Sequence, residues 1–383
     1  MAANFASIPL VDFQDAISPA TRPRFLSALR HALVNVGFFY LQNPPVGAEL
    51  RDKLVKTTNA FFDLPDEKKL ELDINNSKHG RGYGRSGTEK TAMRKDMRET
   101  LTVGFDSPIR NPDLPIYYNI EGPNQWLPEA TTPRLRQAID AYLEETQELA
   151  EKFTVLVAEA LDLDPTAFNK LLFQRRPRNS HLRIGAYPKP GCSQATELEF
   201  QGVGPHKDGS FLTYLLQGTE HSSLEVQNKS GNWIPVPPVP NTLVVNIGRS
   251  LEALTKGVCV ATTHRVSLTL RQFLGPDNIP LGTRLSFAFF QFLDLDVTRD
   301  DMSLELPPQI LQLREVDVKS DAETFFDDIF NGPVGEALLI NLITSYPLLG
   351  ERWYPDLLGK SLKQQHEAKL LDDAKLRRDA QAD

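Results

Sequence analysis

Between residues 181 and 295 the sequence consists of short apolar segments, rich in β-branched and aromatic residues, that alternate with turn-forming residues. The segments are HLRIGAYP, SFLTYLLQG, SSLEVQ, WIPVP, NTLVVNIG, VCVATTHRVSL and TRLSFAFFQFLD, and two of the separators are NKSG (228–231) and GPDN (275–278). Many short strands at even spacing are typical of a β-sandwich or barrel, of which the double-sheet jelly roll is one form. The sequence therefore predicts an α+β protein with a mainly β core, a jelly roll (double-stranded β-helix) flanked by N-terminal and C-terminal helices.

The regions on both sides of this core have helical patterns. Upstream, the predicted elements are a strand over 8–13, a helix over about 19–35, a strand over 37–43 and a helix over about 47–62. The longest predicted helix has Thr132 as its N-cap and Pro133 as its first residue, and its apolar face continues to about Leu161. After residue 295 the chain is expected to return to helix.

Three further segments are rich in glycine or in charge. HGRGYGRSG (79–87) is expected to be a mobile loop over the pocket. KDMRE (95–99) is expected to be a solvated turn or strand entry, with the alternative that Arg94 or Arg98 meets an acidic substrate. The strongly charged tail, 359–383, is expected to be a solvated helix or a frayed end.

Composition narrows the class of protein. The chain of 383 residues is 40% apolar and 24% charged, as in ordinary globular proteins, and no linker-like stretch divides it. Its net charge of −8 argues against a nucleic-acid binder. Two cysteines are too few for a disulfide framework. No signal-peptide pattern and no apolar run of about 20 residues is found, so we expect a cytoplasmic protein that does not interact with membranes.

Two histidines and an aspartate in the β-rich region have the residue types of a metal site. His206 and Asp208 are two residues apart, so in an extended segment both side chains lie on one face. His264 follows 56 residues later, which is enough for the strands of a jelly roll to return beside this pair. Two histidines and one carboxylate that leave open positions are the signature of non-haem Fe(II) oxygenases. The alternatives are that Asp208 and Gly209 only close a turn, and that His264 is a strand histidine with a structural role.

A possible anion site lies on the last strand. Arg284 and Ser286 are two apart in an apolar run, and buried arginine is rare unless it is paired with an anion. A guanidinium beside a hydroxyl suits the far end of a dicarboxylate, and Tyr187 in RIGAYP could reach the same group. The alternatives to an anion site are that Arg284 lies at the exposed end of the strand, that Ser286 is only a small residue that allows close packing, and that Tyr187 is a core aromatic.

Segments along most of the chain resemble one enzyme family. In order, they are IPLVDF, NVGFFYLQN, FFDLPDEKK, RGYG, RIGAYP, PHKDGSFLTYLLQ, LEVQNKSGNWIPVPP, LVVNIG, ATTHRVSL, RLSFAFF and RWYPDLL. This succession resembles the 2-oxoglutarate/Fe(II)-dependent dioxygenase superfamily, in the branch that includes isopenicillin N synthase and the plant flavonoid and gibberellin oxygenases. The resemblance implies His206, Asp208 and His264 as catalytic iron ligands, and Arg284, Ser286 and Tyr187 as residues that bind 2-oxoglutarate.

The resemblance also implies a domain organisation and a reaction. The chain 1–383 is then a single catalytic unit, with an N-terminal dioxygenase-type region (7–125), a long helix and connection (126–178), the jelly-roll core (179–294) and a C-terminal helical segment (295–383). Fe(II), 2-oxoglutarate and O2 are the implied cofactor and cosubstrates, with ascorbate as a reductant. The products are succinate, CO2 and a small organic metabolite, by default of secondary metabolism, that has been hydroxylated, desaturated or cyclised.

Two rival interpretations remain open. A keto-acid-independent oxidase like isopenicillin N synthase keeps the iron ligands and the Arg-x-Ser pair, and uses the pair for its substrate's carboxylate. A non-catalytic jelly-roll binding module is the second rival. A closed structural zinc site is less consistent with the sequence, since it needs a fourth ligand that is not evident.

The chain departs from the pattern of the branch at three places. Gly185 stands where asparagine is common, and Arg249 follows NIG where aspartate is common. The connection between His264 and Arg284 is about ten residues longer than usual, with the insert at 269–282. We expect a longer hairpin loop there, with the Arg284 region unchanged.

Overall fold

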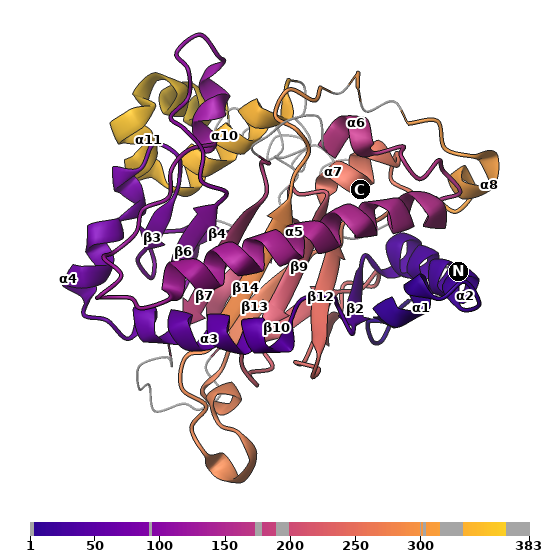
Figure 1. Ribbon diagram of the computed structural model, residues 1–383, viewed down its shortest axis with the longest axis horizontal. Coiled ribbons are helices and arrows are strands. Elements are labelled where there is room, and N and C mark those ends of the chain that lie inside the picture. The colour runs from indigo at the N-terminus through magenta and orange to yellow at the C-terminus, as the bar shows by residue number, and fades with distance from the viewer. Residues whose placement is uncertain are drawn as a thin grey trace, which may run out of the picture.

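Two β-sheets form the centre of the structure, with helices on the outside (Figure 1). This computed structural model describes residues 4–91, 94–172, 178–188, 199–298, 300–301, 304–314 and 332–364. Within them, the larger sheet has eight strands in the order β1 (Leu10–Asp12), β2 (Phe38–Gln42), β12 (Thr242–Ile247), β9 (Leu212–Gln217), β14 (Arg284–Gln291), β7 (His181–Tyr187), β6 (Glu99–Gly104) and β3 (Gly82–Gly84). The smaller sheet has the order β11 (Trp233–Pro235), β10 (Leu224–Gln227), β13 (His264–Leu268) and β8 (Phe200–His206), and β4 (Lys90–Thr91) pairs with β5 (Arg94–Lys95) alone.

The eight strands β7 to β14 confirm the predicted jelly roll. Apart from the β10–β11 hairpin, consecutive strands alternate between the two sheets, and all their pairings are antiparallel. Residues of both sheets, among them Phe38, Val203, Val226 and Val266, form a buried cluster between them. The N-terminal region widens the larger sheet, with β1 and β2 at one edge and β6 and β3 at the other.

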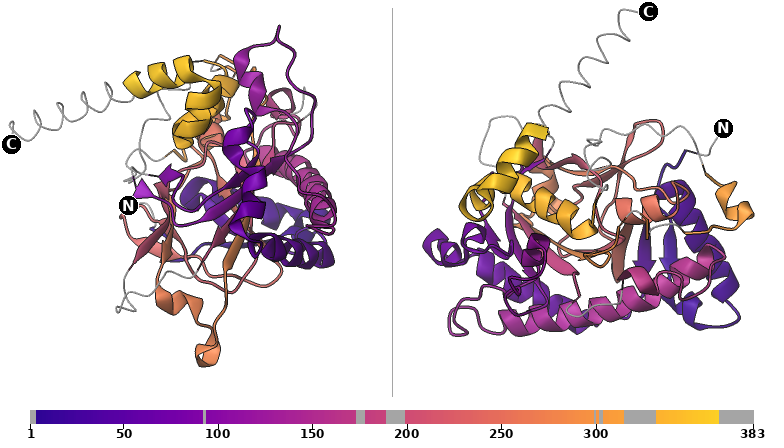
Figure 2. Two further views of the ribbon diagram at one scale, coloured as in Figure 1. Left: turned by 90° about the vertical axis from the view of Figure 1, so that its left-hand side faces the viewer. Right: turned by 90° about the horizontal axis from the view of Figure 1, so that it is seen from above.

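Helices cover the outer face of the larger sheet. The longest, α5 (Leu135–Ala160), crosses this face beside α2 (Arg22–His31) and α3 (Ala48–Phe62) (Figures 1 and 2). The shorter helices are α1 (Phe13–Ile17), α4 (Asp66–Lys69), α6 (Asn169–Leu172), α7 (Arg249–Leu254), α8 (Pro308–Leu311), α10 (Val334–Ser345) and α11 (Pro347–Trp353). A π-helical turn, Ala32–Val36, continues α2, and short 3₁₀ turns lie at Leu70–Leu72, Ile74–Asn76, Ile116–Ile120, Leu270–Phe273 and Pro276–Asn278.

Strand β14 shows how the sequence separates the two faces of the larger sheet. Leu285, Phe287 and Phe289 belong to the hydrophobic core under the helices. Because side chains alternate along a strand, Arg284 and Ser286 face the opposite way, toward the interior of the jelly roll. The apolar positions fix the register of the strand, and the polar positions are thereby aimed at the interior.

The start of α5 differs from the prediction. The helix begins at Leu135, and Thr132 is not its N-cap. Arg134 has a φ of 63°, in the left-handed region, so its backbone cannot belong to a right-handed helix. The side chain of Glu129 accepts a hydrogen bond of 2.7 Å from the backbone N–H of Arg134, which fixes this turn.

The glycine-rich segment at 79–87 is a buried strand in part, and the prediction of a mobile loop was wrong. Strand β3 pairs with β6, and Tyr83 is 2% exposed. Gly82 has a φ of 127°, and a Cβ atom there would lie 2.3 Å from the carbonyl oxygen of Leu72. Glycine therefore serves close backbone packing here.

The insert at 269–282 is not a hairpin loop, because β13 and β14 belong to different sheets and do not pair. It connects the two sheets and extends from one end of the core (Figure 1). A capping box between Thr269 and Gln272 starts its first 3₁₀ turn. Phe273, at the end of that turn, is 1% exposed and packs into the cluster between the sheets. The insert is thus anchored in the core by one aromatic side chain.

The C-terminal helices pack against the N-terminal region. Helix α10 contacts the turn Ile116–Ile120, and α11 contacts the turn Ile74–Asn76. Residues 355–364 are helical, and 365–383 of the charged tail lie outside the described residues. No described helix is both long enough and apolar enough to cross a membrane.

Candidate metal centre

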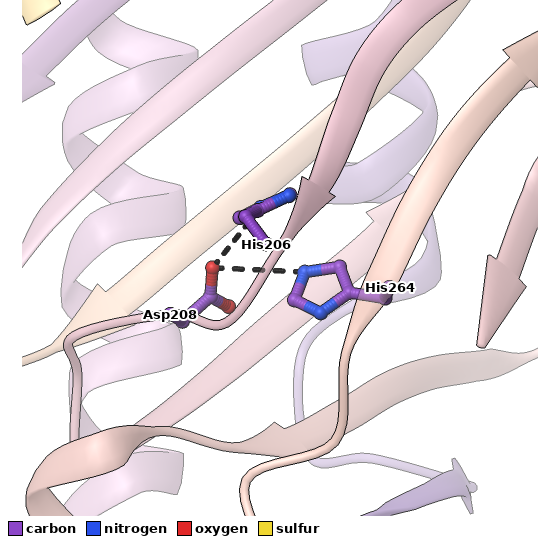
Figure 3. A group of neighbouring side chains, drawn as sticks. All are labelled: His206, Asp208 and His264. Atoms are coloured by element: carbon purple, nitrogen blue, oxygen red, sulfur yellow. Dashed lines mark ion pairs between the residues drawn. The ribbon is translucent and has the colours of Figure 1, made fainter. Parts of the chain in front are cut away.

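His206, Asp208 and His264 come together at one end of the jelly roll (Figure 3). His206 ends β8, His264 begins β13, and the two are direct partners in the antiparallel pairing. Asp208 follows in the loop that leads to β9. Its Oδ1 lies 3.5 Å from Nε2 of His206 and 3.6 Å from Nε2 of His264. One ligand-type atom from each residue therefore lies within 4.8 Å of the others.

Hydrogen bonds fix which atom each residue presents. Nδ1 of His206 lies 2.8 Å from the carbonyl oxygen of Gly204, and Nδ1 of His264 lies 3.2 Å from that of Thr262. A carbonyl oxygen only accepts hydrogen bonds, so in each neutral imidazole Nδ1 carries the proton and Nε2 keeps a free lone pair. Burial lowers the pKa of His206, but Asp208 outweighs it and raises the pKa above its usual value, so a metal ion and a proton compete for this Nε2.

The carboxylate of Asp208 is oriented in the same way. Oδ2 accepts hydrogen bonds from the hydroxyl of Thr213 (2.6 Å) and from the amide of Asn246 (2.8 Å). Oδ1 is left to face the two histidines (Figure 3). Among the described residues, no fourth histidine, cysteine or carboxylate joins the group. Two imidazole nitrogens and one carboxylate oxygen, with their other polar atoms held by neighbours, fit an Fe(II) ion with open positions.

Charge in this group favours metal binding. Burial raises the pKa of the Asp208 carboxyl, but His264, His206 and the Asn246 amide outweigh it and hold the pKa below its usual range. Burial, together with the nearby His206, lowers the pKa of His264 to about 4. A neutral imidazole and an ionised carboxylate, the forms that bind metals, are therefore present at neutral pH.

Arg284, Ser286 and Tyr187 also lie side by side. Arg284 pairs with Tyr187 across β14 and β7, and its Cζ lies 4.4 Å from the centre of the tyrosine ring. The Arg284 side chain is 2% exposed, its Nη1 has no hydrogen-bond partner, and no described carboxylate pairs with it. The Ser286 and Tyr187 hydroxyls are neighbours, since a Cβ atom at Gly185 would lie 3.1 Å from the first and 3.3 Å from the second. A buried guanidinium without an anionic partner is costly, so this group is ready for an acidic ligand.

Comparisons with known proteins agree with this geometry. Residues 8–129 match the family model of the non-haem dioxygenase in morphine synthesis N-terminal region, and residues 173–292 match that of the 2OG-Fe(II) oxygenase superfamily. A 2-oxoglutarate-dependent dioxygenase of Gibberella zeae is 44% identical over 97% of this chain and 98% of the relative. The chain belongs to the 2OG-Fe(II) oxygenase superfamily. It is a 2-oxoglutarate-dependent dioxygenase, an oxidoreductase that uses Fe(II), 2-oxoglutarate and O2.

Other relatives and solved structures support this assignment. The 2-oxoglutarate-dependent dioxygenase frbJ of a Dothideomycetidae species is 38% identical over 95% of this chain and 96% of the relative. A full-length Neurospora crassa enzyme, crystallised with alpha-KG and thymine, has a TM-score of 0.65 at 22% identity and covers 88% of this chain and 97% of its own. At that identity the likeness shows the shared fold. Of the three interpretations left open by the sequence, the comparisons support the 2-oxoglutarate-dependent enzyme.

The dioxygenase has an ion-pair cluster beside the site that the sequence did not reveal. Glu89 accepts hydrogen bonds of 2.8 Å from both Arg98 and Arg183, and Asp96 lies 3.6 Å from Arg98. The Arg98 side chain is only 12% exposed, so this residue is not solvated, whereas the expected strand entry is confirmed because β6 begins at Glu99. The partners Glu89 and Asp96 of this arginine are near in the sequence, whereas Arg183, which shares Glu89, comes from the distant strand β7.

The departures at Gly185 and Arg249 leave the metal centre intact. Gly185 faces Ser286 across β7 and β14, and a Cβ atom there would lie 3.1 Å from both the Ser286 hydroxyl and the Tyr187 ring. Arg249 begins α7, and its backbone N–H donates to the carbonyl oxygen of Asp208 at 2.8 Å. This backbone contact fixes the loop of Asp208 and does not depend on the side chain at position 249.

Proposed function

We propose that His206, Asp208 and His264 bind the Fe(II) ion of this dioxygenase. The observation that carries the proposal is the convergence of two Nε2 atoms and one Oδ1 atom within 4.8 Å, while hydrogen bonds restrain the other polar atoms of these side chains. When bound, the iron and 2-oxoglutarate supply O2 activation, with release of succinate and CO2. The chain's part is to hold the three ligand atoms on one side and to leave the other side open.

Arg284, Ser286 and Tyr187 are the proposed binding residues for the far carboxylate of 2-oxoglutarate. The support is the burial of Arg284 without a carboxylate partner, together with the two hydroxyls beside it. A bidentate pair with a carboxylate would satisfy the free Nη1 and neutralise the buried charge. The enzyme would then prefer a keto acid with a second carboxylate.

The proposed substrate is a small organic metabolite of secondary metabolism, oxidised at a C–H bond in the cytoplasm. Two relatives support this class by their names: a clavatol oxidase of Penicillium crustosum, 29% identical over 76% of this chain, and a flavonoid 7-O-demethylase of Ocimum basilicum, 31% identical over 73%. The isopenicillin N synthase-like branch and the division into regions at 125, 178 and 294 belong to the same proposal. The acidic net charge of −8 disfavours nucleic acid as the substrate.

Iron content and turnover of 2-oxoglutarate test the proposed ligands. The protein is loaded with Fe(II) without oxygen and desalted, and bound iron is measured, followed by succinate formation with ascorbate and O2. His206→Ala is expected to lose iron and succinate formation, whereas His31→Ala, at an exposed site on α2, retains both. A folded His206→Ala protein with the iron content of the wild type would contradict the assignment.

A further inference from the structure

Arg98, Tyr187 and Arg284 form a row across three neighbouring strands. Tyr187 on β7 pairs with Arg284 on β14, and Ala186 pairs with Glu99 at the start of β6, so Arg98 lies beside Tyr187 on its other side. Glu99 bonds Lys69 at 2.8 Å, on the face of the sheet where the N-terminal helices lie. Because side chains alternate along an extended chain, Arg98 points the other way, into the jelly roll.

Arg98 also bridges the two sheets on the side of the metal centre. The backbone N–H of Met97 donates to the carbonyl oxygen of Gln201 on β8 at 2.9 Å, and β8 ends at His206. Asp96 accepts hydrogen bonds from the side chain of Gln201 (2.9 Å) and from the backbone of Gly204 (3.4 Å). Arg98 is therefore held between the strand of His206 and the strand of Tyr187.

The guanidinium of Arg98 is restrained but not saturated. Its Nη2 bonds Glu89, while its buried Nε has no hydrogen-bond partner. Glu89 is shared with Arg183, and the second carboxylate near Arg98, that of Asp96, lies farther away at 3.6 Å. Burial raises the pKa of Tyr187, yet Arg98 and Arg284 outweigh it and lower the pKa below its usual value, as expected where two cations meet at one phenol. A ligand with negative charge at both ends would match two guanidiniums on opposite sides of Tyr187.

We propose that Arg98 is a second 2-oxoglutarate-binding arginine, which contacts the carboxylate next to the keto group while Arg284 holds the far carboxylate. The inference rests on the proposed function, since it assumes that Arg284 marks the remote end of the cosubstrate. Asp96, two residues before Arg98, accepts a hydrogen bond from the backbone N–H of Gly204, two residues before His206, and on this ground we assign Arg98 to the carboxylate nearer the metal centre. The N-terminal region therefore supplies part of the cosubstrate site, and the jelly-roll core alone does not complete it.

Two keto acids separate the roles of the two arginines. 2-Oxoglutarate and 2-oxopentanoate share the carboxylate next to the keto group, but the second acid has a methyl group in place of the far carboxylate. Their dissociation constants are measured by calorimetry without oxygen on the full chain loaded with Mn(II), so that no turnover is needed. Arg98→Met is expected to raise the dissociation constants of both acids by a similar factor. A lost charge-assisted hydrogen bond corresponds to roughly ten- to hundredfold. Arg284→Met is expected to raise the dissociation constant of 2-oxoglutarate and to leave that of 2-oxopentanoate unchanged.

Controls separate binding from folding. Arg22→Met removes an arginine that pairs with Glu159 far from the site, and is expected to leave both dissociation constants unchanged. Arg98→Lys keeps the charge and its Glu89 partner, so its dissociation constants for both acids are expected to lie between those of the wild type and Arg98→Met. This variant replaces Arg98→Met if the methionine variant does not fold. Mn(II) affinity and melting temperature are measured for each variant.

The measured affinities decide whether Arg98 contacts the carboxylate next to the keto group. Wild-type affinities for both acids in a folded Arg98 variant would overturn the inference, and so would a loss confined to 2-oxoglutarate, which would place Arg98 at the far carboxylate. If the Mn(II)-loaded wild type binds neither acid, the proposed function itself fails, and the Arg98 inference fails with it.

Discussion

The hydroxyl of Thr213 is predicted to hold Asp208 ready for the metal, and Thr213→Val tests this. Valine has nearly the same shape, so the change removes little packing; besides the bond to Asp208 it removes the 2.9 Å hydrogen bond between the Thr213 and Ser210 hydroxyls. The lost hydrogen bond with Asp208 is 2.6 Å long, to the buried oxygen of an ionised carboxylate. Bonds of this type contribute about 1.5–3 kcal/mol, and second-shell partners of metal ligands typically change metal affinity by roughly 10–100-fold.

We therefore expect Thr213→Val to lower the free energy of unfolding of the metal-free protein by about 1.5–3 kcal/mol. Fe(II) affinity, measured by competition with a chromophoric chelator without oxygen, should fall by roughly 10–100-fold. Thr58→Val is the matched control, because this buried hydroxyl donates to the carbonyl of Leu54 in α3, away from the site. The reasoning is refuted if Thr213→Val binds Fe(II) within about twofold of the wild type while Asp208→Ala does not bind it.

Three other predictions concern the surroundings of the site. Gly248→Ala should lower both the melting temperature and metal affinity, because its Cβ would lie 1.8 Å from the carbonyl oxygen of Ser210 in the loop that follows Asp208; an unchanged melting temperature would contradict the close contact. Phe273→Ala should cost about 3–5 kcal/mol in a denaturant titration, whereas Ile279→Ala, 63% exposed in the same insert, should cost little; equal costs would mean that the insert is not anchored in the core. Glu89 has a pKa lowered to about 2, because two arginines outweigh the effect of burial, so its stabilising contribution is complete above about pH 4.5 and is lost as the pH falls toward 2. The stability advantage of the wild type over Glu89→Gln should thus shrink by up to about 1.4 kcal/mol per pH unit below pH 4.5, and an advantage that stays constant from pH 6 to pH 3 would argue against this.

Residues whose partners lie on regular strands were predictable from the sequence. Arg284 and Ser286 are two apart on β14, and strand alternation alone puts them on one face, whereas Asp208 lies in the loop after β8, two residues beyond His206. The prediction that His264 lies beside His206 and Asp208 also required the jelly-roll topology, which the even spacing of short strands indicated. The structure places these residues together because the apolar positions between them fix the registers of β8, β13 and β14.

Features set by contacts between distant segments were not predictable in this way. The sequence indicated only that Arg98 could meet an acidic substrate; the cluster that buries it depends on Arg183 of the distant strand β7, which shares Glu89 with Arg98. The start of α5 depends on the side chain of Glu129, which overrides the local preference for Thr132 as the cap. Residues 269–282 run from one sheet to the other because β13 belongs to the smaller sheet and β14 to the larger one. Local propensity carries no information about such pairings.

The central claim is that Fe(II) at His206, Asp208 and His264 and 2-oxoglutarate at Arg284 share one site. The most direct measurement is the visible difference spectrum of the Fe(II) protein on addition of 2-oxoglutarate without oxygen, with Arg284→Ala measured alongside. We predict a metal-to-ligand charge-transfer band in the wild type, and a higher 2-oxoglutarate concentration to reach half its intensity in the variant. The absence of a band while iron remains bound, or a band that is unaffected by Arg284→Ala, would contradict the claim.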